Sequence, residues 1–150
     1  MKKTDDPQLS SSLAQSFGQV LIKSARLYNE SAIAQLKEHV PGIRTAHTLL
    51  FPYVPLQGIR LTVLAKKVGV SKQAVAQLVD ELVEMGAFVK VPDPSDGRAR
   101  LIRWSDAEQI HSGLAALERV QGPLVEALGA ERMARLRGDL TDVLRVLEGL

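Results

Sequence analysis

Apolar side chains recur every three to four positions over residues 9–40, a spacing that is typical of an amphipathic helix. Pro41-Gly42 ends this pattern, because proline and glycine both disfavour continuation of a helix. A shorter helical pattern follows over residues 44–51 and stops at Pro52. The N-terminal third of the chain is therefore predicted to form one long helix and one short helix.

The C-terminal third also has helical periodicity, which predicts helices at residues 105–128 and 130–150. A Gly-Pro pair at residues 122–123 is expected to kink or interrupt the first of them. One stripe of the last helix is apolar: Met133, Leu136, Leu140, Val143, Leu144, Leu147 and Leu150. A chain of 150 residues forms too small a core to bury the apolar faces of both its N-terminal and its C-terminal helices. We therefore expect residues 9–40 and 105–150 to pair across the two-fold axis of a homodimer. The alternative is a helical hairpin within one chain.

Residues 62–86 have the pattern of two helices with Gly69 between them. Thr62 is placed to cap the first helix and Ser71 to cap the second, which Gly86 closes. Gly69 falls where a tight turn requires positive φ, a conformation that costs glycine little. A helix, a turn containing glycine and a longer helix at this spacing indicate a helix-turn-helix unit.

The exposed face of the second helix changes in character along its length. Its first turns present Lys72, Gln73 and Gln77, whereas later turns present only carboxylates: Asp80, Glu81 and Glu84. Carboxylates repel phosphates, so we expect only the N-terminal end, with its free N–H groups, to enter a DNA groove. Glutamine amides suit base edges, adenine especially, and Lys72 suits a phosphate or a guanine. The alternative is that each of these residues is simply solvated.

Residues 87–91 and 99–104 alternate apolar and polar side chains, as half-buried strands do. The segment between them, residues 92–98, is rich in Pro, Asp, Ser and Gly and is predicted to be a loop. A β-hairpin directly after a recognition helix is a wing. Arg98 lies near its tip and Arg100 on its returning strand, where arginines suit the narrow, electronegative minor groove of DNA.

Composition and charge narrow the classes of protein further. The net charge is +2, but residues 56–104 carry eight Lys/Arg and five Asp/Glu, whereas residues 105–150 carry five and eight. An anionic partner would therefore dock on the middle of the chain, unless these charges are only a solvated surface. Cysteine is absent, which excludes disulfides and thiol chemistry, and no apolar run approaches the roughly 18 residues of a membrane span. We expect a soluble cytoplasmic protein that does not contact membranes.

The sequence VSKQAVAQLVDELVEMGAFVKVPDPSDGRARL, followed by WSDAE, resembles the winged helix-turn-helix core of the MarR family of bacterial transcriptional regulators. The match is densest over residues 59–106, and its most specific part is Asp96–Ala99. The resemblance implies a single domain over residues 1–150. In it, the helices of residues 9–40 and 105–150 form the dimer interface and residues 44–104 form the DNA-binding lobe. The fold class is then mainly α with a small β-hairpin wing (α+β).

The resemblance also implies a function: a homodimeric, sequence-specific regulator, expected to be a repressor, that reads a pseudo-palindromic operator in double-stranded DNA. Its groove-facing positions correspond here to Ser71, Lys72, Gln73 and Gln77, its wing-tip arginine to Arg98, and the acid that supports that arginine to Asp96. Many members have arginine at the positions of Gln77 and Glu81. In this chain the helix therefore has fewer cations for phosphate contacts, and we expect the wing to contribute more of the affinity for DNA. The usual glycine shortly after the wing is Glu108 here.

Members of this family often bind a small anionic aromatic or lipophilic effector. Candidate residues for such a site are Tyr28, Arg44, His47, Phe51, Trp104 and His111. Arg44 and His47 lie three residues apart on one predicted helix, so together they can meet a carboxylate. The alternative for Phe51 and Trp104 is that they are core residues.

Three other classes of function have less support in the sequence. The histidines, His39, His47 and His111, include no pair at the i, i+3 or i, i+4 spacing that places two ligands on one helix face, so we expect no metal site. The sequence has no phosphate-binding glycine loop and no motif that supports a Ser/His/Asp set, so we expect neither an enzyme nor a cofactor. A winged helix that contacts only proteins, without a DNA target, remains the alternative.

Overall fold

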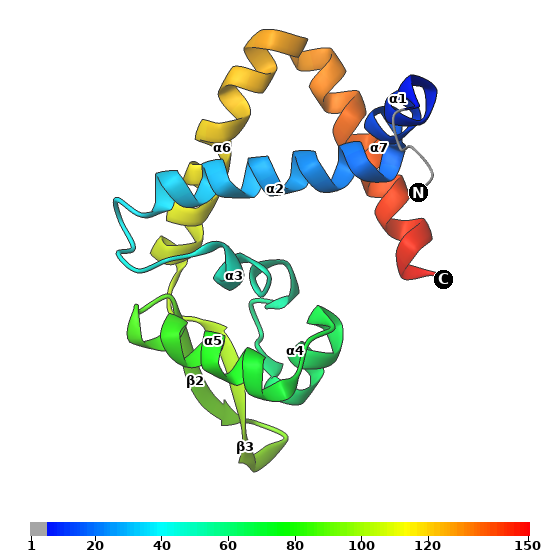
Figure 1. The fold of residues 1–150 in the computed structure, drawn as a ribbon. Helices are drawn as coiled ribbons and strands as arrows, with labels where there is room; N and C mark the ends of the chain where they lie inside the picture. Colours follow the sequence, from blue (N-terminus) through cyan, green and yellow to red (C-terminus); the bar gives the residue numbers. More distant parts are fainter. Residues whose placement is uncertain (1–5) are drawn as a thin grey trace.

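The computed structural model describes residues 6–150 of the chain. The elements are α1 (Pro7–Gln15), α2 (Phe17–Leu36), α3 (Thr45–Thr48), the 3-10 helix η1 (Phe51–Tyr53), β1 (Ile59–Arg60), α4 (Leu61–Val68), α5 (Lys72–Glu84), β2 (Phe88–Asp93), β3 (Asp96–Trp104), α6 (Ala107–Leu128) and α7 (Ala130–Glu148). Figure 1 shows two regions: α1, α2, α6 and α7 form a helical arch, and α3, α4, α5 and the strands form a lobe beneath it. The predicted fold class, mainly α with a small β-hairpin wing, is confirmed.

The N-terminal helical region is two helices rather than the single helix predicted over residues 9–40. The chain leaves the helical conformation at Ser16, whose ψ is 127°, and α2 ends at Leu36, before Pro41-Gly42. Serine is disfavoured in a helix interior, because its side chain competes with the backbone for hydrogen bonds, but the Ser16 side chain makes no capping bond to α2. The apolar spacing continues across Ser16, so periodicity alone did not reveal the break.

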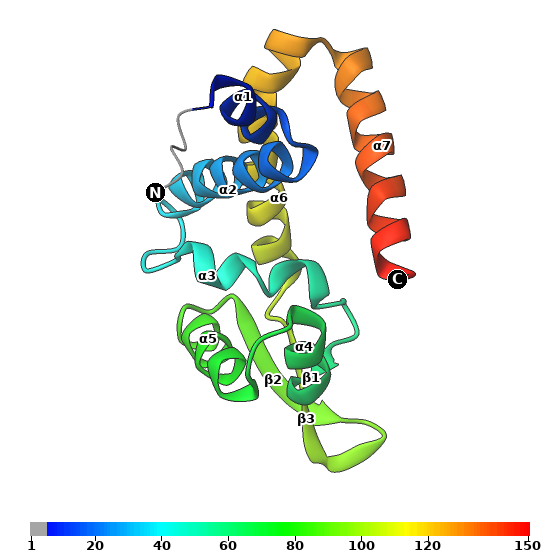
Figure 2. The ribbon, with the colours of Figure 1, turned by 45° about the vertical axis from the view of Figure 1, so that its right-hand side comes forward.

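The C-terminal half of α2 joins the arch to the lobe. Ala32, Ile33 and Leu36 are buried there, as is Ala116 on α6. The Tyr28 hydroxyl donates a 3.2 Å hydrogen bond to the Leu117 carbonyl oxygen across the same contact. Figure 2 shows α2 crossing α6, whereas α7 runs down from the top of the arch after its turn from α6.

The helix-turn-helix unit has the predicted form with one difference. Gly69 ends α4 with φ of 78°, and the Ser71 hydroxyl oxygen accepts a 3.2 Å hydrogen bond from the Ala74 N–H at the start of α5. The prediction that Thr62 caps α4 is wrong, because the helix begins at Leu61 and its flanking residue, Arg60, makes no capping bond with its side chain. Arg60 ends strand β1 instead, so the chain passes from strand to helix without a capping residue.

The sheet has the order β1-β3-β2 and is antiparallel throughout. β1, a strand of two residues that the sequence pattern did not reveal, pairs Ile59 with Ile102 of β3. The hairpin is longer than predicted, because β2 continues to Asp93 and β3 begins at Asp96, within the segment of residues 92–98 that was predicted to be a loop. Pro92 is tolerated because β2 is an edge strand, where a missing N–H breaks no ladder.

The core lies where α2, α4, α5 and the sheet meet. Its fully buried side chains are Leu50, Leu64, Val75, Val79, Leu82, Phe88 and His47. The ring of Phe88 packs edge-on against Phe51 and Trp104, with centroids 6.0 and 5.0 Å away. α6 passes through Pro123 without interruption but changes direction in its C-terminal part, as predicted for a kink, and the turn to α7 lies at Gly129 (Figure 1).

Candidate nucleic-acid interface

The N-terminal end of α5, from its capping residue Ser71 through its second turn, presents the polar residues that the sequence predicted for a groove. Ser71, Lys72, Gln73 and Gln77 are all exposed, while Val75 and Leu78 on the opposite face are buried. The helix packs on the hairpin behind it through Val79 and Leu82, which share a buried core with Phe88 of β2, and the exposed Lys90 Nζ also donates a 2.5 Å bond to Asp80 Oδ1. The exposed end of α5 and the wing are therefore held in a set relation to each other.

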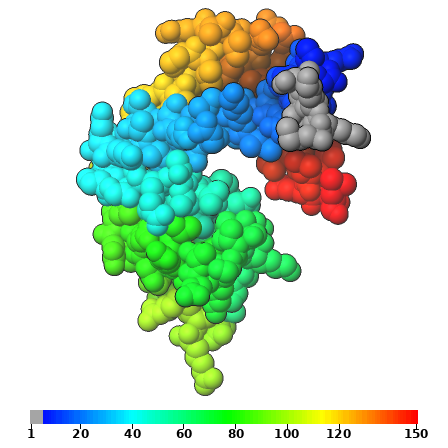
Figure 3. Space-filling view, in the orientation of Figure 1, coloured from blue at the N-terminus to red at the C-terminus, as the bar shows by residue number. Residues whose placement is uncertain are grey.

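The wing projects from the end of the lobe that lies opposite the arch (Figure 3). Arg98 and Arg100 lie on β3 and are exposed. Neither is among the residues that form ion pairs in residues 6–150. Two cationic side chains on a thin hairpin are thus available to an anionic partner.

A carboxylate that sequence reasoning missed anchors the wing. Asp93 is 8% exposed in its side chain, and Arg60 of β1 donates a 2.6 Å bond to its Oδ2 from Nε. Its Oδ1 accepts bonds from the Ser95 N–H (2.9 Å) and hydroxyl (2.7 Å). The Ser95 bonds, followed by that from Arg60, lower the pKa of Asp93 to about 2. Asp93 and Ser95 are separated by one residue in a Pro-rich turn, which is the signal that could have found this site.

Asp96, the predicted supporting acid, has a smaller part in holding the wing. Its Oδ1 accepts a 3.1 Å bond from the Arg98 N–H, and its other oxygen lies 3.9 Å from Arg60 Nη2. It therefore shapes the backbone at Arg98 and does not pair with the Arg98 side chain. Asp93 binds Arg60 and Ser95, so the two carboxylates hold different parts of the wing.

Arg44 and His47 meet a carboxylate together, as their spacing predicted, but it belongs to the chain itself. Glu81 Oε2, on α5, accepts bonds from Arg44 Nη2 (2.5 Å) and His47 Nε2 (2.7 Å). The bond from Arg44, then that from His47, lowers the pKa of Glu81 to about 2. Both residues are thereby engaged in joining α3 to α5.

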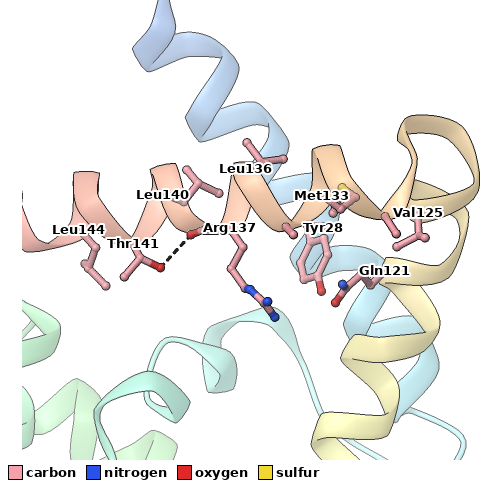
Figure 4. Close-up of a pocket in the computed structure, with 11 residues that line it drawn as sticks. Tyr28, Gln121, Val125, Met133, Leu136, Arg137, Leu140, Thr141 and Leu144 are labelled. Atoms are coloured by element: carbon pink, nitrogen blue, oxygen red, sulfur yellow. Dashed lines mark hydrogen bonds between the residues drawn. The ribbon is translucent and has the colours of Figure 1, made fainter.

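The other effector candidates are divided among three places. Phe51 and Trp104 line a crevice of about 360 Å³ between α2, η1 and α6. Tyr28 lines a separate pocket of about 480 Å³ between α2, α6 and α7, together with Arg137 and the apolar stripe of α7 (Figure 4). His111 is exposed on α6 and lines neither. The six residues do not form one site.

Within residues 6–150, no three residues of the metal-binding types His, Asp and Glu cluster closely enough to hold an ion. No helix in the described part of the chain combines the length and the apolar character that crossing a membrane requires.

Comparison with known proteins identifies the fold. No protein-family model and no curated protein matches the sequence. Solved structures do match. The multiple antibiotic resistance repressor MarR has a TM-score of 0.67 at 20% identity, over 86% of this chain and 95% of that one. CouR from Rhodococcus jostii RHA1, bound to p-coumaroyl-CoA, has a TM-score of 0.64 at 22% identity, over 87% and 93%. CouR bound to a 23-mer DNA duplex has a TM-score of 0.60 at 18% identity, over 89% and 95%.

These likenesses show that the chain has the winged helix-turn-helix fold of the MarR-type transcriptional regulators, as its sequence predicted. They extend over the helical arch as well as the lobe beneath it, since they cover at least 86% of the chain.

Proposed function

We propose that this protein is a transcriptional repressor that binds a pseudo-palindromic operator in double-stranded DNA as a homodimer. One observation carries the proposal: an exposed helix N-terminus bearing Lys72, Gln73 and Gln77 is followed by a hairpin with two exposed arginines, Arg98 and Arg100. CouR, which has the same fold, has been solved on a DNA duplex. The similar structures are transcriptional regulators rather than enzymes, and we propose no catalytic activity.

On this proposal, each half of the interface has its own task. The first N–H groups of α5 and the ammonium of Lys72 contact phosphates, which places the helix in the major groove. Gln73 and Gln77 face the base edges, and Arg98 enters the neighbouring minor groove. Glu84 is the last residue of α5 and lies away from the groove, and the charge of Asp80 is paired with Lys90 of β2, so neither opposes binding strongly.

The exposed apolar surface of the arch supports the homodimer. Neither α1 nor α7 contains a buried residue. The exposed apolar side chains of the arch include Leu9, Leu13, Phe17, Val20, Leu124, Leu136, Leu140, Leu144 and Leu147. A contact between α6 and α7 within one chain therefore leaves this surface open to water, and such surfaces mark protein interfaces. We propose that the arch of a second copy covers it.

The crevice beside Trp104 supports an effector. Its lining is largely apolar, with Leu36, Ile43 and Phe51 among its walls, and no lining residue carries a charge. Its volume of about 360 Å³ falls in the range of small-molecule sites. We propose an uncharged aromatic or lipophilic effector, because the anionic group expected from the family resemblance has no counter-charge in this crevice.

Salt dependence of binding tests the DNA-binding function before any operator is known. Anisotropy of a labelled duplex of arbitrary sequence would be measured between about 50 and 200 mM salt, with the wild type, Arg98→Ala and Arg145→Ala. Arg145, on α7, is a matched arginine outside the lobe. We expect affinity to fall steeply with salt and Arg98→Ala to reduce the slope by about one, with Arg145→Ala unchanged. If the affinity does not change with salt concentration, the alternative of a winged helix that contacts only proteins is favoured.

A further inference from the structure

The side-chain amide of Gln77 is held in one orientation by its neighbour on the next turn of α5. Gln77 Nε2 donates a 3.1 Å hydrogen bond to Glu81 Oε1. An ionised carboxylate can only accept, so the NH₂ end of the amide must face Glu81 and the carbonyl end must face away. An amide beside water alone has no such preference.

Glu81 is itself fixed from α3, on its other oxygen. Oε2 accepts from Arg44 Nη2 at 2.5 Å and from His47 Nε2 at 2.7 Å. His47 is fully buried, and its Nδ1 accepts a 3.1 Å bond from the Arg44 N–H, so the ring proton lies on Nε2, facing Glu81. The carboxylate therefore cannot rotate away from Gln77 without breaking two charge-assisted or buried bonds.

The fixed amide presents a defined pattern to the groove. One N–H of Gln77 is used by Glu81, which leaves the carbonyl oxygen and the second N–H of this exposed side chain available to a partner. An acceptor beside a donor complements the N6 amino group and N7 of adenine. Guanine offers two acceptors, O6 and N7, one of which would face the carbonyl oxygen of the glutamine.

We propose that Glu81 is a specificity-determining residue that locks Gln77 to read adenine at one position of each operator half-site. This inference rests on the proposed DNA-binding function. Glu81 does not touch the base: it acts by positioning Gln77, and its negative charge lies near the DNA. Its removal therefore relaxes discrimination at a single base position while strengthening binding to DNA in general, a pair of effects that loss of structure does not produce.

The test is selection of binding sites from random duplex DNA with four proteins: the wild type, Glu81→Gln, Gln77→Ala and the control Glu84→Gln. Glu84 is an exposed carboxylate on the same helix, and its replacement removes the same charge. Affinities are then measured on the selected site and on the site with the adenine changed to guanine. Thermal unfolding and sedimentation show whether each variant is folded and has the assembly of the wild type.

We expect the wild type and Glu84→Gln to prefer adenine over guanine by roughly 5- to 150-fold at one position per half-site. Glu81→Gln should reduce that preference to a few-fold, leave the other positions unchanged and bind arbitrary DNA more tightly. Gln77→Ala should abolish the same preference, and it tests the assignment even if Glu81→Gln does not fold.

Two results would overturn the inference, and they differ in meaning. If the wild type enriches a motif whose adenine preference survives in Glu81→Gln or Gln77→Ala, this assignment is wrong and the DNA-binding function stands. If the folded wild type enriches no motif at all, the proposed function fails and takes the inference with it.

Discussion

The indole Nε1 of Trp104 donates a 3.0 Å hydrogen bond to the carbonyl oxygen of Val54, which joins the end of β3 to the segment after η1. The same indole ring packs against Phe51 and Phe88, with centroids 5.2 and 5.0 Å away. Trp104 thus closes the core of the lobe on one side and forms a wall of the crevice on the other. Trp104 therefore contributes both to the packing of the lobe and to the shape of the crevice.

Phe88→Ala tests the aromatic part of the core. Phe88 is 2% exposed, so its truncation removes buried apolar surface and leaves a cavity between Phe51 and Trp104. We expect the free energy of unfolding to fall by about 3–5 kcal/mol. Urea denaturation measures it, with Leu56→Ala as a control at a side chain that is 64% exposed. Equal losses in the two variants would contradict this account of the core.

Gly113→Leu tests the crevice. Gly113 lies on α6 and lines the crevice, and a Cβ added there would meet no heavy atom within 4 Å. We expect the leucine side chain to fill part of the space and abolish binding of an uncharged aromatic dye, measured by fluorescence, while DNA affinity stays within two-fold or so. Gly113→Ala, which adds one methyl group, should keep dye binding. Undiminished binding by the leucine variant would place the ligand elsewhere.

Leu144→Glu tests the dimer interface. Leu144 lies on α7 and is 54% exposed in a single chain, so its truncation or replacement costs one copy little. At an apolar interface, however, a buried unpaired carboxylate costs several kcal/mol. We expect sedimentation to show the monomer for Leu144→Glu and the dimer for Leu56→Glu, which lies in the other region. A dimeric Leu144→Glu variant would exclude this face of α7 from the interface.

Acid should destabilise the protein through two carboxylates. The pKa of Glu81 falls from 4.5 to about 2 on folding, chiefly through the bond from Arg44, and that of Asp93 falls from 3.8 to about 2, chiefly through Ser95. Between these values the unfolded chain binds more protons than the folded one, so the stabilisation is complete above about pH 4.5 and is lost towards pH 2.

Thermal unfolding across this range measures the effect. We expect the Tm of the wild type to fall steeply from pH 4.5 to 2, and a variant with Glu81→Gln and Asp93→Asn to show a shallower decline. The variant should be less stable than the wild type at neutral pH and approach it near pH 2. Parallel curves would show that neither carboxylate is linked to folding.

Local signals explain why much of the lobe was predictable. The turn at Gly69 and the cap at Ser71 depend on residues within a few positions of each other, and both occur as predicted. Alternation within residues 87–91 and 99–104 similarly located the hairpin, although the structure extends β2 to Asp93 and begins β3 at Asp96. The loop is shorter than predicted because Ser95 donates two hydrogen bonds to the Asp93 side chain and closes a tight turn. The alternation of apolar and polar residues carries no information about these side-chain bonds.

Contacts between distant segments explain what was missed. Glu81 receives its bonds from residues 37 and 34 positions earlier in the chain, and nothing in its local sequence names Arg44 or His47 as partners. β1 is only two residues long and exists because β3 pairs with it. The sequence therefore indicated which residues have useful chemistry, whereas the fold decides which of them meet.

The measurement that tests the central claim most directly is selection of wild-type binding sites from random duplex DNA at moderate salt, followed by sequencing. The account predicts an inverted repeat whose half-sites lie about one helical turn, roughly 10 base pairs, apart, because two recognition helices related by a two-fold axis enter successive major grooves. Recovery of no motif by folded, dimeric protein would contradict the claim that this winged helix reads DNA sequence.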